Sequence, residues 1–202
     1  MAVQLASIFF TMILVDNYVL VKFLGICPFL GVSKKLDSAV GMSLAVTFVM
    51  VLATAATWPI QTFLLTPESG AWDLGYLQTI VFILIIAILV QLLENILKKF
   101  IPTLYKSLGV YLPLITTNCT ILGVTILNID NGYNFMESIV CAAGAGIGFL
   151  VAMVLFSGVR RKVEEAVTPK CFEGLPITLV SAAVTSLSFM GFGGIIESIF
   201  HV

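Results

Sequence analysis

Six long apolar runs, each bounded by polar residues, proline or glycine, divide the sequence and constrain its fold more than any other feature. About 20 apolar residues suffice for a helix to cross a bilayer. Only 10% of the residues are charged, against about a quarter in soluble domains. We therefore predict one all-α transmembrane domain over residues 1–202, with no room for a sizeable soluble domain. The runs are 2–33, 38–65, 75–97, 101–129, 135–158 and 175–199.

The basic residues lie on alternate connections between these runs. Lysine and arginine are enriched in cytoplasmic loops, so we expect the three basic connections to face the cytoplasm and both termini to lie outside. We expect the first run to be a retained helix, because it lacks the basic segment of a signal peptide. The basic residues are Lys22, Lys34 and Lys35, then Lys98, Lys99 and Lys106, then Arg160, Arg161, Lys162 and Lys170.

A short motif occurs twice, 92 residues apart. Cys-x-x-Leu-Gly-Val begins at Cys27 and again at Cys119. This offset spans three helices, so the second copy is inverted relative to the first, and we predict two inverted three-helix repeats, about 1–100 and 101–202. Such repeats bring broken helices together near the bilayer midplane. The first and fourth runs carry the motif, and their length together with Pro28 and Pro113 predicts broken or re-entrant helices there.

The two motif cysteines are the strongest site candidates. Shifting Cys141 and Cys171 back by 92 positions gives Val49 and Thr79, so only Cys27 and Cys119 form a symmetric pair. Paired thiolates beside broken backbone suit a metal or iron–sulfur centre. A [2Fe–2S] cluster needs four thiolates, so a second copy or a related partner must supply the rest. Two alternatives remain open: small buried hydrophobes, or a disulfide between the two.

A few polar residues within the runs are candidates for an ion path. Asp16 and Lys22 stand six residues apart in the first run, where weak pairing along a helix is one alternative to an ion-binding role. Glu94 precedes Lys98 by four positions, the spacing of an interfacial ion pair. The oxygens of Thr116, Thr117 and Asn118 either line an ion path or satisfy the broken backbone. The single His201 makes a histidine metal site improbable.

Other patterns exclude several function classes. Gly144, Gly146 and Gly148 do not follow a strand, so we interpret them as a close helix contact and not as a nucleotide fingerprint. The sequence has no P-loop, no Ser-His-Asp set and no basic aromatic patch for nucleic acid. We therefore expect no hydrolase and no nucleic-acid-binding protein.

Three segments resemble a known family. LVDNYVLVKFLGICPFLGVSKKL (14–36), PTLYKSLGVYLPLITTNC (102–119) and SLSFMGFGGI (186–195) are similar to the A subunits of Rnf ion-translocating electron-transport complexes. The similarity covers nearly the whole chain. Related membrane subunits of Rnf and of the sodium-pumping NADH:quinone oxidoreductase share the cysteine motifs. FLGICPFLGVSKKL and the outward N-terminus favour the A type over the oppositely inserted E type.

This resemblance implies a part in a redox pump of the bacterial or archaeal cytoplasmic membrane. The complex would move electrons between ferredoxin and NAD while carrying Na⁺ or H⁺, and the chain would not be catalytic alone. In the family, A-like and E-like subunits associate as inverted partners around one [2Fe–2S] cluster, alongside B-, C-, D- and G-like subunits. By motif, the ligands here would be Cys27 and Cys119, with no role assigned to Cys141 or Cys171. The alternatives are a secondary transporter with a midplane site and, third, a membrane anchor.

Overall fold

The computed structural model describes residues 2–33, 36–65, 78–100, 114–115, 117–166, 169 and 173–200, and within these ranges it is helical without strands. The helices are α1 (Ala2–Leu14), α2 (Ile26–Val32), α3 (Leu36–Ile60) with the π-helical turn η1 (Gln61–Leu65), α4 (Gln78–Phe100), α7 (Cys119–Asp130), α8 (Phe135–Glu165) and α9 (Leu175–Phe200). Each predicted run corresponds to one helix or to a pair of helices.

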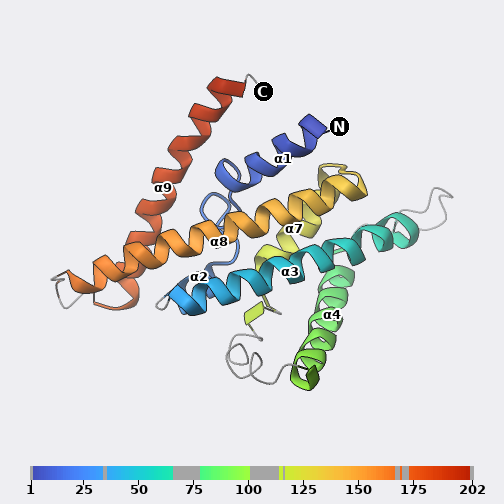
Figure 1. The fold of residues 1–202 in the computed structure, drawn as a ribbon, viewed down its shortest axis with the longest axis horizontal. Helices are drawn as coiled ribbons and strands as arrows, with labels where there is room; N and C mark the ends of the chain where they lie inside the picture. The colour runs from blue at the N-terminus through green and yellow to red at the C-terminus, as the bar shows by residue number, and fades with distance from the viewer. Residues whose placement is uncertain are drawn as a thin grey trace.

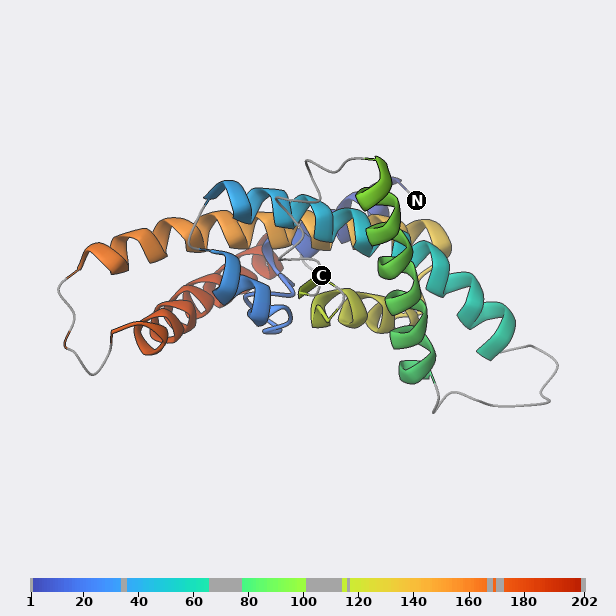
Figure 2. The same cartoon turned by 90° about the horizontal axis from the view of Figure 1, so that it is seen from below.

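Two long helices, α3 and α8, form the centre of the molecule. They run side by side across the longest dimension (Figure 1), and α2, α7 and α9 lie beneath them in the perpendicular view (Figure 2). At 1.5 Å per residue, α8 is about 46 Å long, so it extends beyond a hydrocarbon layer of about 30 Å. Its C-terminal end carries Arg161 and Lys162, both 85% exposed.

Glycines in α8 allow close approach of its neighbours. A Cβ at Gly144 would lie 3.1 Å from the Phe9 carbonyl oxygen of α1, and one at Gly148 would lie 3.0 Å from that of Met12. At Gly146 a Cβ would lie 2.4 Å from Thr47 of α3. Small residues let helix backbones meet where lipid provides no hydrophobic driving force. The predicted close helix contact is confirmed.

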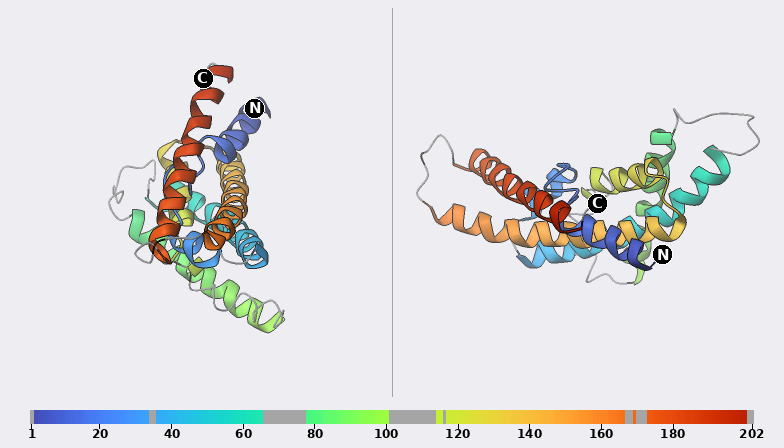
Figure 3. Two further views of the ribbon diagram at one scale, coloured as in Figure 1. Left: turned by 90° about the vertical axis from the view of Figure 1, so that its left-hand side faces the viewer. Right: turned by 90° about the horizontal axis from the view of Figure 1, so that it is seen from above.

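Helix α4 is the least buried of the three helices that are long and apolar enough to cross a bilayer. Only 17% of an 18-residue apolar stretch of α4 is buried within the chain. The helix projects from the rest of the molecule (Figure 3). Its outward face consists of large apolar side chains, as expected of a helix that meets lipid or another protein chain. These side chains are Ile80, Ile83, Leu84, Ile88, Leu92 and Ile96.

The helices agree with the predicted membrane class. Within the described residues, three are long and apolar enough to cross a bilayer, over Leu36–Phe63, Gln78–Ile96 and Phe135–Glu165, and three more apolar helices are shorter. The break predicted in the first run is present, because α1 ends at Leu14 and α2 begins only at Ile26. In the fourth run, α7 has only 12 residues, too few to span, and most of the run before it lies outside the described residues.

The assignment of Lys22 to the basic connection after the first run was wrong. Lys22 lies inside the break of that run, between α1 and α2. It is exposed, and its Nζ lies 4.9 Å from the centroid of the Tyr18 ring. Asp16 also lies outside the helices, so the weak pairing of Asp16 with Lys22 along one helix, which was the alternative to an ion-binding role, does not form. Local periodicity cannot reveal such a break, because the apolar run continues through it.

Candidate functional site

The break between α1 and α2 is held by a buried asparagine. Asn17 is fully buried, and its Nδ2 donates to the Gly148 carbonyl of α8 at 2.8 Å. Its Oδ1 accepts from the backbone N–H groups of Val19 at 3.1 Å and Leu20 at 3.4 Å. Away from water, each backbone group released by a broken helix needs such a partner. One side chain therefore supports much of the non-helical segment.

Two further contacts fix the same segment to α8 and α9. Ser186 of α9 donates its hydroxyl hydrogen to the Leu20 carbonyl. Tyr18 is buried, with its hydroxyl 4.0 Å from the Cys141 sulfur of α8. Cys141 is thus a buried packing residue, as expected for a small hydrophobic side chain. The break is an ordered turn seated between two helices.

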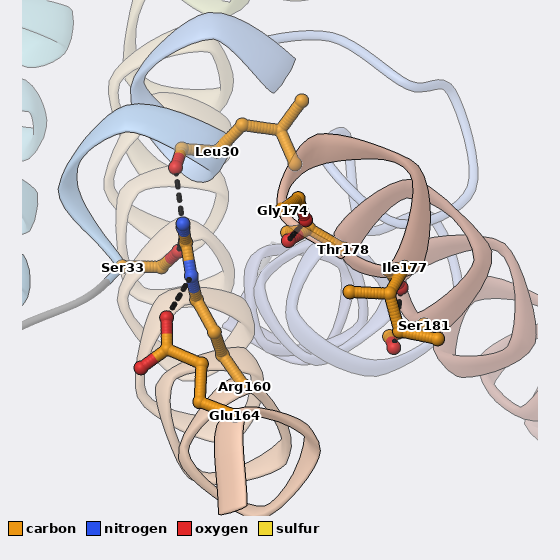
Figure 4. Close-up of polar contacts among 8 residues, drawn as sticks. All are labelled: Leu30, Ser33, Arg160, Glu164, Gly174, Ile177, Thr178 and Ser181. Atoms are coloured by element: carbon orange, nitrogen blue, oxygen red, sulfur yellow. Dashed lines mark hydrogen bonds and ion pairs between the residues drawn. The ribbon is translucent and has the colours of Figure 1, made fainter. Parts of the chain in front are cut away.

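The C-terminal end of α2 is held by Arg160 of α8 (Figure 4). This side chain is only 8% exposed. Its Nη1 donates to the Leu30 carbonyl and, at 2.8 Å, to the Ser33 hydroxyl oxygen, while its Nε pairs with Glu164 at 3.3 Å. The last carbonyls of a helix lack partners within the helix, and a cation there also complements the helix dipole. Arg160 therefore caps the short helix that carries Cys27.

The second cysteine begins α7. Asn118 precedes it as the N-cap, and its Oδ1 accepts from the Thr120 N–H at 3.1 Å. Asn118 and Thr120 are both buried, whereas the Cys119 thiol is exposed. Asparagine is a favoured N-cap because its side chain replaces a missing helical acceptor. The cap determines where α7 starts and places Cys119 in its first turn.

The two motif segments meet at Gly25. The Gly25 N–H donates to the Cys119 sulfur at 2.9 Å, and a Cβ added at Gly123 would lie 2.6 Å from Leu24. The Cα of Cys27 is two residues further, at most about 7.6 Å from that of Gly25. Both Cys27 and Cys119 are free, exposed thiols. The structure thus brings together two segments that lie 94 positions apart at this contact, without a disulfide between the thiols.

The other predicted site residues are dispersed. Asn118 lies beside Cys119, and Thr117 occupies the exposed turn before it. Asp16 is half-buried in the break between α1 and α2, and Glu94 is half-buried on α4. Thr116 lies outside the described residues, as does Cys171. The proposed ion path therefore has members on separate elements, with only the residues next to Cys119 at the cysteine site.

Two residues that build this site, Asn17 and Arg160, were missed from the sequence. Each acts on a partner far along the chain, so no local pattern reports it. Gly25 was expected to interrupt the first run, but its contact with Cys119 was not predicted. A signal existed for Asn17, which is a strong turn former. Arg160 is the first residue of a basic cluster and was indistinguishable from its solvated neighbours.

The donor set at this site suits a shared thiolate centre. Within the described ranges, His, Cys, Asp and Glu never gather in groups of three or more, and the site contains the free thiols of Cys27 and Cys119. Beside them, Asn118 Nδ2 and Thr120 Oγ1 are buried without a hydrogen-bond partner in the described part of the chain. Unsatisfied buried polar atoms require an explanation, and a polar or charged group between the two segments would provide it. The residues present fit half of an iron–sulfur ligand set.

The fold and site define a helical integral membrane protein with two exposed thiols beside a helix break. Residues 5–196 match the family described as Rnf-Nqr subunit, membrane protein. The chain is 56% identical over 190 residues (94% of this chain, 97% of the relative) to the A subunit of the Na(+)-translocating ferredoxin:NAD(+) oxidoreductase complex of Acetobacterium woodii. It is 53% identical to the A subunit of the ion-translocating oxidoreductase complex of Syntrophotalea carbinolica, covering 91% of this chain and 93% of the relative.

The chain therefore belongs to the Rnf-Nqr family of membrane subunits. A third relative, the A subunit of the ion-translocating oxidoreductase complex of Serratia proteamaculans, is 52% identical over 92% of this chain and 94% of its own length. The resemblance to A subunits of Rnf complexes, first seen in three segments, is confirmed over nearly the full chain.

Proposed function

We propose that this chain is the A-type subunit of an ion-translocating ferredoxin:NAD oxidoreductase complex and supplies two of the four thiolate ligands of an intramembrane [2Fe–2S] cluster. The observation that supports this proposal most directly is the hydrogen bond from the Gly25 N–H to the Cys119 sulfur. It joins the two cysteine segments while both thiols stay exposed. Exposed thiols in an apolar membrane protein suit a centre that a second chain completes. The E-like sister is the partner we propose, with B-, C-, D- and G-like subunits completing the complex.

The chain's own residues would hold and shield the centre. When bound, a [2Fe–2S] cluster accepts and releases one electron at a potential set by its surroundings. Arg160 and Asn17 fix the two ends of the segment that carries Cys27, and Asn118 fixes the start of α7. Because these anchors are buried, the thiols keep their separation as charge changes. A fixed geometry lowers the reorganisation that accompanies electron transfer.

The proposed topology is six crossings arranged as two inverted repeats in the cytoplasmic membrane, with basic connections inside and both termini outside. The exposed Arg161 and Lys162 at the end of α8 support an inner position for that end. We further propose Asp16, Glu94, Thr116, Thr117 and Asn118 as members of a path for Na⁺ or H⁺. Half-buried carboxylates in an apolar chain support this assignment, because ionisable groups at membrane depth are costly.

The decisive test uses the purified complex and single cysteine variants. Cys27→Ser and Cys119→Ser should each remove about two irons and two acid-labile sulfides per complex, together with the matching visible absorption. Cys141→Ser is the matched control and should retain both, because its side chain is buried against Tyr18. If both motif variants keep the full iron and sulfide content, the cluster assignment is wrong.

A secondary transporter remains the second candidate, favoured by the broken helix whose non-helical segment is seated between α8 and α9. Liposomes containing this chain would then take up substrate without any electron donor. The complex that we propose should move ions only when a reductant and an acceptor are both supplied.

A further inference from the structure

The contact between Gly25 and Cys119 is the only hydrogen bond that a motif-cysteine sulfur receives within the described residues. The donor is a backbone N–H, and the N···S distance of 2.9 Å is short for sulfur, whose larger radius normally keeps donors further away than the roughly 2.9–3.0 Å of N–H···O bonds. The neighbouring Cys27 sulfur receives no such bond in the described part. The two thiols therefore differ in the hydrogen bonds that the described residues give them.

Gly25 can make this contact because it lacks a side chain. Its φ of +84° lies in the left-handed region that glycine adopts without cost. A Cβ there would lie 2.1 Å from Thr120 Oγ1, 3.1 Å from Asn118 Oδ1 and 3.3 Å from Phe149. Any larger residue must push the break away from the start of α7. The N–H bond to sulfur thus depends on both the backbone conformation and the missing Cβ.

Two orphaned polar atoms lie at the same place. Asn118 and Thr120 are 4% and 0% exposed, and their Nδ2 and Oγ1 atoms are among the buried atoms that have no hydrogen-bond partner within the described residues. Since Thr120 Oγ1 lies against Gly25 and Asn118 precedes Cys119, both flank the Gly25–Cys119 contact. This side of the site is therefore richer in polar groups than an apolar helix junction requires.

We propose that Gly25 is a positioning residue that raises the reduction potential of the centre by donating its N–H to the Cys119 thiolate. This inference rests on the proposed function, since it concerns the cluster assigned to Cys27 and Cys119. Hydrogen bonds to a ligand sulfur stabilise the more negative, reduced state. In the assembled complex, the cluster would gain one electron, without a proton, that originates from oxidation of reduced ferredoxin. The added charge would spread onto the ligand sulfurs and strengthen the Gly25 N–H bond. Electron arrival therefore tightens the contact between the break and α7.

The first experiment detects the bond directly. The complete complex is labelled with [¹⁵N]glycine and reduced, and the signal of this cluster is isolated by subtracting the spectrum of the Cys27→Ser complex. Pulsed EPR should show one weakly coupled ¹⁵N nucleus. Absence of the coupling from an intact cluster signal overturns the inference. Absence of any cluster signal, with no loss of iron in Cys27→Ser, instead overturns the proposed function.

The second experiment distinguishes an effect of Gly25 on the reduction potential of the cluster from an effect on packing alone. Gly25→Ala should lower the midpoint potential of the clusters that form and abolish the [¹⁵N]glycine coupling, because its Cβ collides with Thr120 Oγ1. Thr120→Ala removes that oxygen, so Gly25→Ala/Thr120→Ala should recover part of the potential and show the coupling with [¹⁵N]alanine instead. Thr120→Ala alone is the reference for the double variant and should retain the [¹⁵N]glycine coupling, because the Gly25 N–H is unchanged.

The outcomes are distinguishable from a merely structural role. A glycine needed only for packing would reduce the number of clusters in Gly25→Ala without shifting their midpoint potential. That result would contradict the proposal. If Gly25→Ala fails to assemble at all, the labelled wild-type complex and the double variant still decide the matter.

Discussion

The three thiols that the structure describes fall into two contrasting environments. Cys27 and Cys119 lie in the first turns of the short helices α2 and α7 and are exposed, whereas Cys141 lies within the long helix α8 and is fully buried. Helix interiors leave no backbone donors free, while helix starts and breaks present N–H groups that stabilise negative charge on sulfur. The difference teaches that the exposed thiols lie next to non-helical backbone, whereas the buried thiol lies within a continuous helix.

Thiol reactivity should show the largest difference. In membranes containing this chain without its partners, and with Cys171→Ser, a small maleimide should label Cys27 and Cys119 about 1,000-fold faster than Cys141, equivalent to an opening free energy of about 4 kcal/mol. Mass spectrometry of the labelled peptides over time measures each rate. Equal rates at the three sites would remove the basis of the comparison. In the assembled complex, the two exposed thiols should become protected.

Removal of the cap on α2 should have the next largest effect. Arg160→Met leaves the Leu30 carbonyl and the Ser33 hydroxyl without their charged donor, which costs about 2–4 kcal/mol in free energy of unfolding. The matched control Arg161→Met, at an 85% exposed position, should change stability by about 0.5 kcal/mol or less. Thermal unfolding in detergent measures both. A similar melting temperature for the two variants would show that Arg160 does not fix α2.

Removal of the Asn17 side chain from the break should lower the free energy of unfolding slightly less than removal of the Arg160 guanidinium. Asn17→Ala loses one bond to α8, one to Ile13 and two within the break, and leaves the buried N–H groups of Val19 and Leu20 without this acceptor, for about 2 kcal/mol. Asn95→Ala, at an exposed position of α4, is the control with an expected change of about 0.5 kcal/mol or less. Limited proteolysis between α1 and α2 measures local opening. Unchanged protection in Asn17→Ala would indicate that packing alone holds the break.

The smallest effect is expected at the buried thiol. Cys141→Ala removes one sulfur atom beside Tyr18 and should destabilise by about 1 kcal/mol, without any change in the iron content of the complex. Thermal unfolding and iron analysis of the same preparation check both parts. Loss of iron in Cys141→Ala would place this cysteine among the ligands and end the contrast between the two environments.

The meeting of the two cysteine segments and the break in the first run could be predicted from the sequence because their signals were repeated or local, whereas the ligand role of the cysteines stays a prediction. The doubled cysteine frame selected Cys27 and Cys119, and the length of the first run with its glycine and proline residues predicted the break. Lys22 was misplaced because the break lies within residues 2–33, which the sequence presents as one mostly apolar run. Arg160 and Asn17 escaped notice because their partners Leu30 and Gly148 lie 130 and 131 positions away.

The apolar runs alone determined that this chain is a helical membrane protein, since a bilayer admits few other ways to satisfy the backbone, and the repeated motif singled out Cys27 and Cys119 as a symmetric pair. Only the tertiary structure decided that the two cysteine segments touch through Gly25, that one sulfur receives an N–H bond, and that the break is held against α8 by buried polar side chains. The physical reason is that the helical period predicts which residues share a face of one helix. Which helices meet depends instead on packing interactions summed over the whole chain.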